Sequence, residues 1–253
     1  MDVSEQYRSA VESQLKTIDQ QLDTIREVSR RFAECILNDG MVHMYGSGHS
    51  RMGVEEMYPR YGSYPGFHPI VELSTSFYNP VIGPNGIKQS MFIENIHGLA
   101  EQIVVNNDVR ETDCFMLFTT SGTGNVVVEM AEAAKSRGCF TVGVISKENS
   151  RVGVSKHPNG LKLEDVADVI LDNGAVIGDA AVTVTGMEYP VGPTSTIGNS
   201  YIVNLIKVNT AQVLADHGYT PAVITHAHYA GKEKSAELFD ASLKEYQRRL
   251  YRK

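Results

Sequence analysis

Three features are scarce or missing in this 253-residue sequence: cysteine pairs, blocks of positive charge and long apolar runs. The three cysteines lie far apart without a C-x-x-C pair, and an odd number behind a polar N-terminus predicts a reducing, cytoplasmic location. The net charge of −7, with no basic block, disfavours nucleic-acid partners. No window approaches about 18 uncharged apolar residues, so a membrane-spanning segment is excluded as well.

Glycine and proline are also absent between Val3 and Asn38. The apolar residues of this stretch recur in steps of three and four, which is typical of one helical stripe. They are Val11, Leu15, Ile18, Leu22, Ile25, Val28, Phe32 and Ile36. Such a helix would be about 50 Å long, longer than the core of a small domain. We therefore predict that part of it packs on another copy of the chain, in a homodimer or homotetramer.

The rest of the chain alternates between apolar strands and helices. A strand over 41–45 leads into a glycine loop and a helix, and a strand over 113–120 repeats this order before a helix over 126–137. Further strands are predicted over 140–146 and 166–172, and further helices over 194–217 and 235–251. This order predicts an α/β fold, a three-layer doubly wound parallel sheet of flavodoxin-like kind.

We expect one domain over 1–253, made of an N-terminal helix (1–40), an α/β core (41–217) and a C-terminal tail and helix (218–253). The stretch from Tyr58 to Asn85 is rich in proline, glycine, tyrosine and histidine. It is predicted to be an irregular loop, and long loops of this kind usually carry function.

Each glycine loop combines glycine with hydroxyl residues, in Gly46-Ser47-Gly48-His49-Ser50 and in Thr119-Thr120-Ser121-Gly122-Thr123-Gly124-Asn125. Hydroxyls and free N–H groups at a helix start suit an anion, and loops that follow adjacent parallel strands face one crevice. Neither loop is a P-loop, and Arg51 stands where a dinucleotide fingerprint needs a small residue. The pattern predicts one small anionic ligand and no cofactor, although ordinary tight turns remain the simpler alternative.

These loops, followed by the strand over 140–146, resemble the sugar isomerase (SIS) domain, whose loops hold the phosphate of a phosphosugar. The resemblance extends from about Val42 to about His217, and the stretches around 171–180 and 192–197 are similar to a bacterial SIS subgroup that largely lacks an assigned activity. It implies that Ser47, Ser50, Ser121 and Thr123 contact the anion and that Thr119 or Thr120 assists. Arg51 and Asn125, the polar neighbours of the loops, complete the predicted substrate-binding residues.

Aldose–ketose isomerisation needs a base beside a carbonyl and donors for the enediolate oxygens. The segment around Glu56 resembles muramic acid phosphate etherases, where a glutamate shortly before prolines acts as acid or base. Glu56 is therefore the first catalytic candidate, and Glu55 is kept because heptose-phosphate isomerases carry a Glu-Glu pair. Both could also lie on a solvated helix face.

Glu94 resembles the second catalytic glutamate of the etherases, and His97 follows three residues later on the expected same helix face. His49, inside the first loop, is a candidate for opening the sugar ring. Surface ion-pairing and packing are the alternatives for these residues. The stretch from 198 to 213 lacks the Glu and His that heptose-phosphate isomerases carry there.

Two further pairs of residues, one of aspartates and one of histidines, are weaker candidates for a functional role. Asp172 and Asp179 flank the end of the fourth predicted strand, where they either bind sugar hydroxyls or cap turns. His226 and His228 could share a strand face, but no third ligand stands at metal-site spacing, and we predict no metal.

The sequence therefore predicts an isomerase of a sugar with a terminal phosphate or sulfonate, acting by proton transfer through a cis-enediol. Two alternatives remain open. One is a sugar-phosphate etherase or lyase that works by β-elimination, and the other is a non-catalytic phosphosugar sensor.

Overall fold

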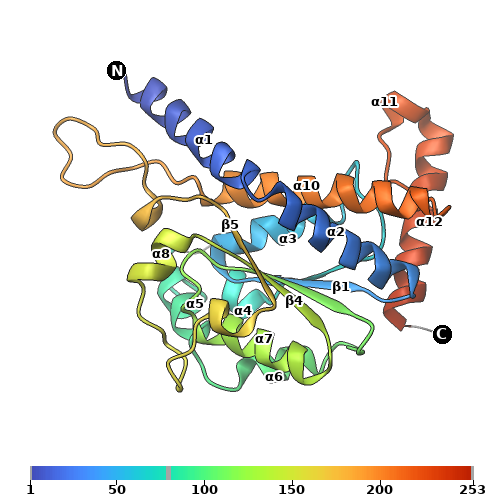
Figure 1. Cartoon of the computed structure of the whole chain (residues 1–253), viewed down its shortest axis with the longest axis horizontal. Helices are drawn as coiled ribbons and strands as arrows, with labels where there is room; N and C mark the ends of the chain where they lie inside the picture. Colours follow the sequence, from blue (N-terminus) through green and yellow to red (C-terminus); the bar gives the residue numbers. More distant parts are fainter. Residues whose placement is uncertain (1, 78–80, 252–253) are drawn as a thin grey trace.

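The computed structural model describes residues 2–77 and 81–251, and within them a parallel sheet carries helices on both faces (Figure 1). The strand order is β2-β1-β3-β4-β5. The strands are β1 (Val42–Gly46), β2 (Phe67–Ile70), β3 (Cys114–Phe118), β4 (Phe140–Ile145) and β5 (Val169–Asp172). This is the order of flavodoxin-like doubly wound sheets, so the predicted fold class is confirmed.

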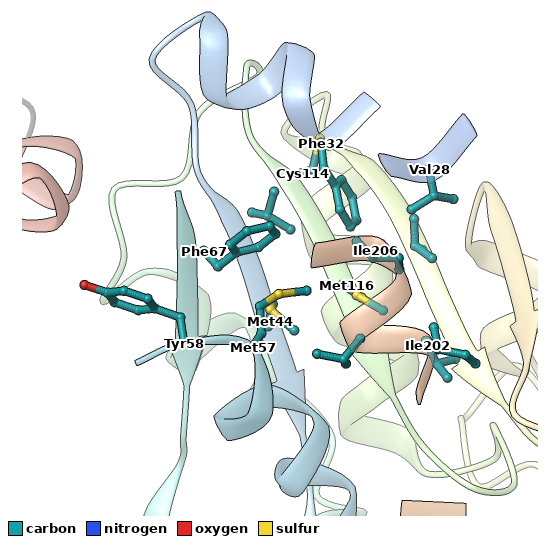
Figure 2. Close-up of a cluster of buried hydrophobic side chains, with 14 of the residues drawn as sticks. Val28, Phe32, Met44, Met57, Tyr58, Phe67, Cys114, Met116, Ile202 and Ile206 are labelled. Carbon is teal, nitrogen blue, oxygen red and sulfur yellow. The ribbon is translucent and has the colours of Figure 1, made fainter. Parts of the chain in front are cut away.

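Alternate residues of each strand supply two separate cores, one on each face of the sheet. On the first face, α2 (Leu22–Leu37), α3 (Arg51–Met57) and α10 (Ser195–Asp216) cover the strands. Figure 2 shows this core, where Phe32 of α2 and Ile206 of α10 lie over Met116 of β3. On the second face, α6 (Leu99–Val104) and α7 (Asn125–Ser136) pack on Phe115 and Leu117.

The N-terminal stretch is not the single helix that its periodicity predicts. It breaks at Gln20 and Gln21 into α1 (Val3–Asp19) and α2. The reason is a tertiary contact, because the Gln21 amide donates to the Asp172 carbonyl at 2.9 Å and its oxygen accepts from the Asp172 N–H at 2.8 Å. On the N-terminal side of this break, α1 extends away from the sheet toward the chain's N-terminus (Figure 1).

The stretch from Tyr58 to Asn85 is more regular than predicted, although its residues 78–80 lie outside the described part of the chain. It contains β2, which pairs with β1 from Val42↔Phe67 onward, and the short helix α4 (Leu73–Ser76). The sequence pattern does not indicate this strand, because it is short and includes Pro69. Proline is tolerated here because β2 is an edge strand.

The remaining helices are α5 (Ile87–Ile93), α8 (Lys147–Val152), α9 (Leu163–Val166), α11 (Ala227–Ala230) and α12 (Lys232–Tyr251), together with the 3₁₀ turns η1 (Gly48–Ser50) and η2 (Ile177–Asp179). Of these, α12 lies close to its predicted position, and the others are short helices for which the sequence analysis gave no bounds. The buried Arg249 ties α12 to the body by donating to the carbonyls of Ile36 and Gly40. None of the helices in 2–77 and 81–251 combines the length and apolarity that a bilayer crossing requires.

Candidate functional site

The two glycine loops lie side by side at the carboxyl edge of the sheet. Gly46 at the end of β1 is in register with Phe118 at the end of β3, so the loops that follow start next to each other. Both loops and the start of α10 line a pocket of about 260 Å³, which we call the loop pocket. Its lining residues are His49, Ser50, Thr120, Asp179, Pro193, Ser195 and Thr196. The structure thus brings the two loops to one pocket.

The first loop requires glycine for a steric reason. A Cβ on Gly46 would stand 2.8 Å from the backbone carbon and oxygen of Ser50, and Gly48 has a φ of 54°. The N–H of Ser50 donates to the Ser47 carbonyl at 3.0 Å, which closes the turn. The backbone is therefore folded tightly enough to bring Ser47 and Ser50 together at the start of α3.

The second loop is held by its own hydroxyls. Ser121 and Thr123 share a hydrogen bond of 2.7 Å between their hydroxyl oxygens, and the Thr119 hydroxyl accepts from the Gly122 N–H at 3.3 Å. Gly122 adopts a φ of 70°, which favours glycine. The predicted anion-binding hydroxyls of the second loop are thereby gathered before the N-terminus of α7, and among these Thr120 lines the loop pocket.

Asn125, which the sequence analysis placed with the ligand, serves the protein itself. Its buried amide donates to the Ile96 carbonyl at 3.1 Å. One residue later, the N–H of Val126 donates to the Glu94 carbonyl at 3.1 Å. The first turn of α7 therefore anchors the turn that follows α5.

Glu94 is brought directly to the first glycine loop. It is the residue after α5, and the Ser47 hydroxyl donates to its Oε2 at 2.6 Å. The backbone bond from Val126 fixes the position of this residue from the opposite side. Of the predicted catalytic carboxylates, Glu94 is the one with a direct bond to a loop hydroxyl in the described residues.

His97 does not share a helix face with Glu94, which corrects the prediction. The helix ends at Ile93, and Gly98, with a φ of 84°, starts a new helix, α6. His97 Nδ1 instead pairs with the buried Glu129 of α7, whose other oxygen accepts from the Gly98 N–H at 2.9 Å. The imidazole, 75% exposed, thus secures the turn between α5 and α6 through Glu129.

Glu56 lies in a second and larger pocket of about 570 Å³, which we call the Glu56 pocket. Its Oε1 accepts from the Asn204 amide at 2.8 Å, and its Oε2 forms an ion pair with Arg60. Its backbone carbonyl accepts from Lys207 at 2.8 Å. Burial lowers the pKa of this lysine, and the nearby Glu56 carboxylate partly offsets the effect.

The two pockets are neighbours, but the structure does not bring Glu56 to the glycine loops. Glu56 follows Ser50 by six residues, a rise of about 9 Å and a rotation of roughly 240° along a helix. The two side chains therefore leave α3 in different directions. Met52 lines the Glu56 pocket and lies 3.9 Å from the hydroxyl of Thr196, which lines the loop pocket.

Arg51 and Glu55 make contacts outside the loop pocket. Arg51 donates to the Ser76 carbonyl at 2.6 Å and lies 3.6 Å from the Glu55 carboxylate. Glu55 is half exposed and lines the Glu56 pocket. These contacts fit a structural role for the pair at the surface of α3.

The remaining candidates divide between capping and stacking. Asp172 caps a turn, because its Oδ1 accepts from the N–H groups of Lys147 and Gly174. His226 stacks on His228 with ring centroids 4.5 Å apart. Within 2–77 and 81–251 no group of three His, Cys, Asp or Glu side chains is placed to hold a metal ion.

The sequence reasoning missed the contribution of α10. Ser195 and Thr196 were predicted only as the start of a helix, yet both line the loop pocket, together with Asp179. A signal was present, since Thr194-Ser195-Thr196 supplies three hydroxyls at a helix start that follows the last strand. Hydroxyls at a helix start, the feature shared by the two glycine loops, therefore also mark this turn.

Comparison with known proteins places this geometry among related chains. Residues 6–146 match the family model of the SIS domain. A UPF0309 protein of Listeria monocytogenes is 31% identical over 206 residues, which cover 81% of each chain. A UPF0309 protein of Geobacillus thermodenitrificans is 29% identical over 231 residues, 91% of this chain and 90% of the relative.

Solved structures of the same fold carry an enzyme name. A phosphoheptose isomerase from Francisella tularensis superposes with a TM-score of 0.52 at 14% identity, covering 83% of this chain and 96% of its own. A phosphoheptose isomerase from Neisseria gonorrhoeae gives a TM-score of 0.51 at 13% identity, covering 84% and 97%. At this identity the likeness shows a common fold.

Proposed function

Because the chain belongs to the SIS domain family and is a member of the UPF0309 group, we propose that it isomerises a sugar with a terminal anionic group between its aldose and ketose forms. The observation that carries the proposal is the loop pocket. Two hydroxyl-bearing loops from paired strands and the start of α10 line one concave site. The phosphoheptose isomerases of the same fold support a sugar phosphate as the substrate class.

The second loop is the proposed site of the anion. It offers the hydroxyls of Thr119, Thr120, Ser121 and Thr123 close to the N-terminus of α7, where the helix dipole favours negative charge. The loop supplies no lysine. Phosphate is the default group, and a sulfonate, which is also tetrahedral with three oxygens, would meet the same donors.

Proton transfer is assigned first to Glu94. Isomerisation needs a base within hydrogen-bond reach of the carbon acid and donors for the enediolate oxygens. Glu94 touches the first loop through Ser47, and His49 and Ser50 of that loop line the pocket, where His49 is the proposed group for ring opening. Glu56 is the second candidate, since its carboxylate lies in the adjoining pocket.

The test has two stages. A thermal-shift screen with hexose 6-phosphates and 6-sulfonates identifies a ligand, because a ligand at about 100 times its Kd adds about 2.7 kcal/mol to stability. NMR in D₂O then follows deuterium exchange at the carbon next to the carbonyl. The Glu94→Gln variant should slow this exchange by about 100-fold or more.

Matched variants make the result specific. Glu55→Gln changes an exposed carboxylate of α3 and should leave exchange intact, and Glu56→Gln tests the second candidate. Unchanged exchange in Glu94→Gln would refute the assignment of the base. Release of lactate from a lactyl ether would instead indicate β-elimination, and binding without any exchange would indicate a sensor.

We propose further that the protein self-associates. Apolar side chains remain exposed on α5, including Met91 at 56% and Phe92 at 70%, and on α12 at Phe239 and Leu243. Removing such groups from water is the main driving force of association. Analytical ultracentrifugation at micromolar concentration should show a dimer or tetramer, and a strict monomer would contradict the proposal.

A further inference from the structure

The first turn of α10 is occupied by a carboxylate of the protein itself. Asp179 Oδ1 accepts from the N–H groups of Thr194 and Ser195, both at 2.9 Å, and its Oδ2 accepts from the Ser195 hydroxyl at 2.5 Å. Thr194, at the N-cap position, makes no side-chain capping bond of its own. Asp179 therefore supplies from a distant turn the negative charge that a helix N-terminus favours.

The position of this carboxylate is fixed from its own side as well. Asp179 has a φ of 49° and follows Gly178 with a φ of 76°. The Gly178 N–H donates to the Asn149 side chain of α8, and the Asp179 N–H donates to the Val176 carbonyl, both at 2.9 Å. An aspartate in this left-handed conformation is uncommon but tolerated. The turn holds the carboxylate at the wall of the loop pocket.

We propose that Asp179 is a specificity-determining residue that excludes a second anion from the loop pocket and orients the substrate. This inference rests on the proposed function. Like charges a few ångströms apart repel strongly at the wall of a partly enclosed pocket. A ligand anion is therefore directed away from α10 and toward the second glycine loop, on the Thr120 side of the pocket.

The carboxylate also has capacity left for a sugar hydroxyl. An ionised carboxylate offers about four lone-pair positions. Oδ1 uses two of them, whereas Oδ2 accepts the Ser195 hydroxyl alone in the described contacts. A hydroxyl at the end of the sugar opposite its anion can donate to Oδ2. The site thus favours sugars with one terminal anion and discriminates against sugar bisphosphates.

The first experiment measures anion binding without reference to catalysis. Isothermal titration with inorganic phosphate compares the native protein with Asp179→Gly and Asp179→Asn. Glycine and asparagine both accept the left-handed conformation, so the turn should persist, and circular dichroism checks the fold. Removing the carboxylate frees the N–H groups of α10, and we expect phosphate to bind at least about tenfold more tightly to Asp179→Gly.

Two controls separate charge from loss of a cap. Asp172→Asn alters a carboxylate that caps a turn outside the loop pocket and should leave phosphate affinity unchanged. Ser195→Ala removes one bond to Asp179 but keeps its charge, and should therefore raise phosphate affinity far less than Asp179→Gly does. Equal phosphate affinity in the native protein, Asp179→Asn and Asp179→Gly would overturn the inference.

The second experiment measures selectivity. The ratio of the Kd for a hexose 1,6-bisphosphate to the Kd for the 6-phosphate should fall at least about tenfold in Asp179→Asn. An unchanged ratio would overturn the inference even if the protein proves to be an isomerase. Conversely, absence of isomerisation together with tighter phosphate binding by Asp179→Gly would refute the proposed activity and support anion exclusion by Asp179.

Discussion

Acidification should destabilise the protein through the buried imidazole of His68 on β2. The ring sits in a hydrogen-bond chain near the amino ends of the strands, away from the glycine loops. Its Nδ1 lies 2.6 Å from the Tyr246 hydroxyl and its Nε2 lies 2.8 Å from Asn107 Oδ1. Because the Asn107 amide nitrogen donates to Ile103, its oxygen faces His68, and the neutral ring fits with Nε2 donating and Nδ1 accepting.

The magnitude follows from the pKa of His68, which is lowered from 6.5 to about 4. Burial is the main cause, because it disfavours the charged ring, and the adjacent His43 adds to it. As the pH falls, the unfolded chain takes up a proton near pH 6.5 and the folded protein only near pH 4. Stability is therefore full above the first value and declines toward the second, by about 2 kcal/mol between about pH 7 and about pH 5.

Urea denaturation at several pH values between about 7 and about 5 measures this loss. His68→Gln keeps polar atoms beside Tyr246 and Asn107 but removes the titrating ring, so its stability should change much less over this range. His228→Gln, which removes an exposed ring, is the control and should behave like the native protein. Parallel pH profiles of the native protein and His68→Gln would refute the reasoning.

Two further predictions concern the first loop and α12. Gly46→Ala would place a Cβ 2.8 Å from the backbone of Ser50. Thermal unfolding should show that the protein loses about 1–3 kcal/mol of stability, and ligand affinity should fall as well. A variant with native stability and native affinity would contradict the close approach. Bonding to Arg248, with the charge of Arg249, lowers the pKa of Glu245 to about 2. That stabilisation is fully present at pH values above the ordinary pKa of glutamate and is lost as the pH falls toward about 2. Glu245→Gln should therefore lower the free energy of unfolding by about 1–2 kcal/mol at neutral pH after solvent screening, as measured by urea denaturation. An unchanged free energy of unfolding would contradict this prediction.

Most strands and long helices were predictable, because apolar periodicity indicates the elements and glycine marks the turns between them. The strands that became β1, β3, β4 and β5 and the helices α7 and α10 lie within a few residues of their predicted bounds. The break between α1 and α2 was not predictable, because it depends on a contact between Gln21 and Asp172, far apart in sequence. Local patterns carry no information about such a partner.

The candidate site was predictable in its loops but less so in its carboxylates. Adjacent parallel strands bring their loops together by topology, and Ser50 and Thr120 share a pocket accordingly. The side chain of Glu56, in contrast, depends on rotation along α3, and that of His97 on Glu129, which lies on another helix. Asp179 was named as a residue that binds sugar hydroxyls or caps a turn, but its bonds to the first turn of α10 could not be predicted from the glycine-loop pattern.

Gln21 has a consequence for how the chain avoids aggregation. β5 is an outer strand of the sheet, and outer strands can recruit other chains through their open backbone groups. One amide side chain satisfies both the N–H and the carbonyl of Asp172, in the manner of a neighbouring strand. Loss of this glutamine would leave the backbone groups of Asp172 open at the edge of the sheet. The junction of the N-terminal helices therefore covers part of the edge strand β5 as well as linking α1 to α2.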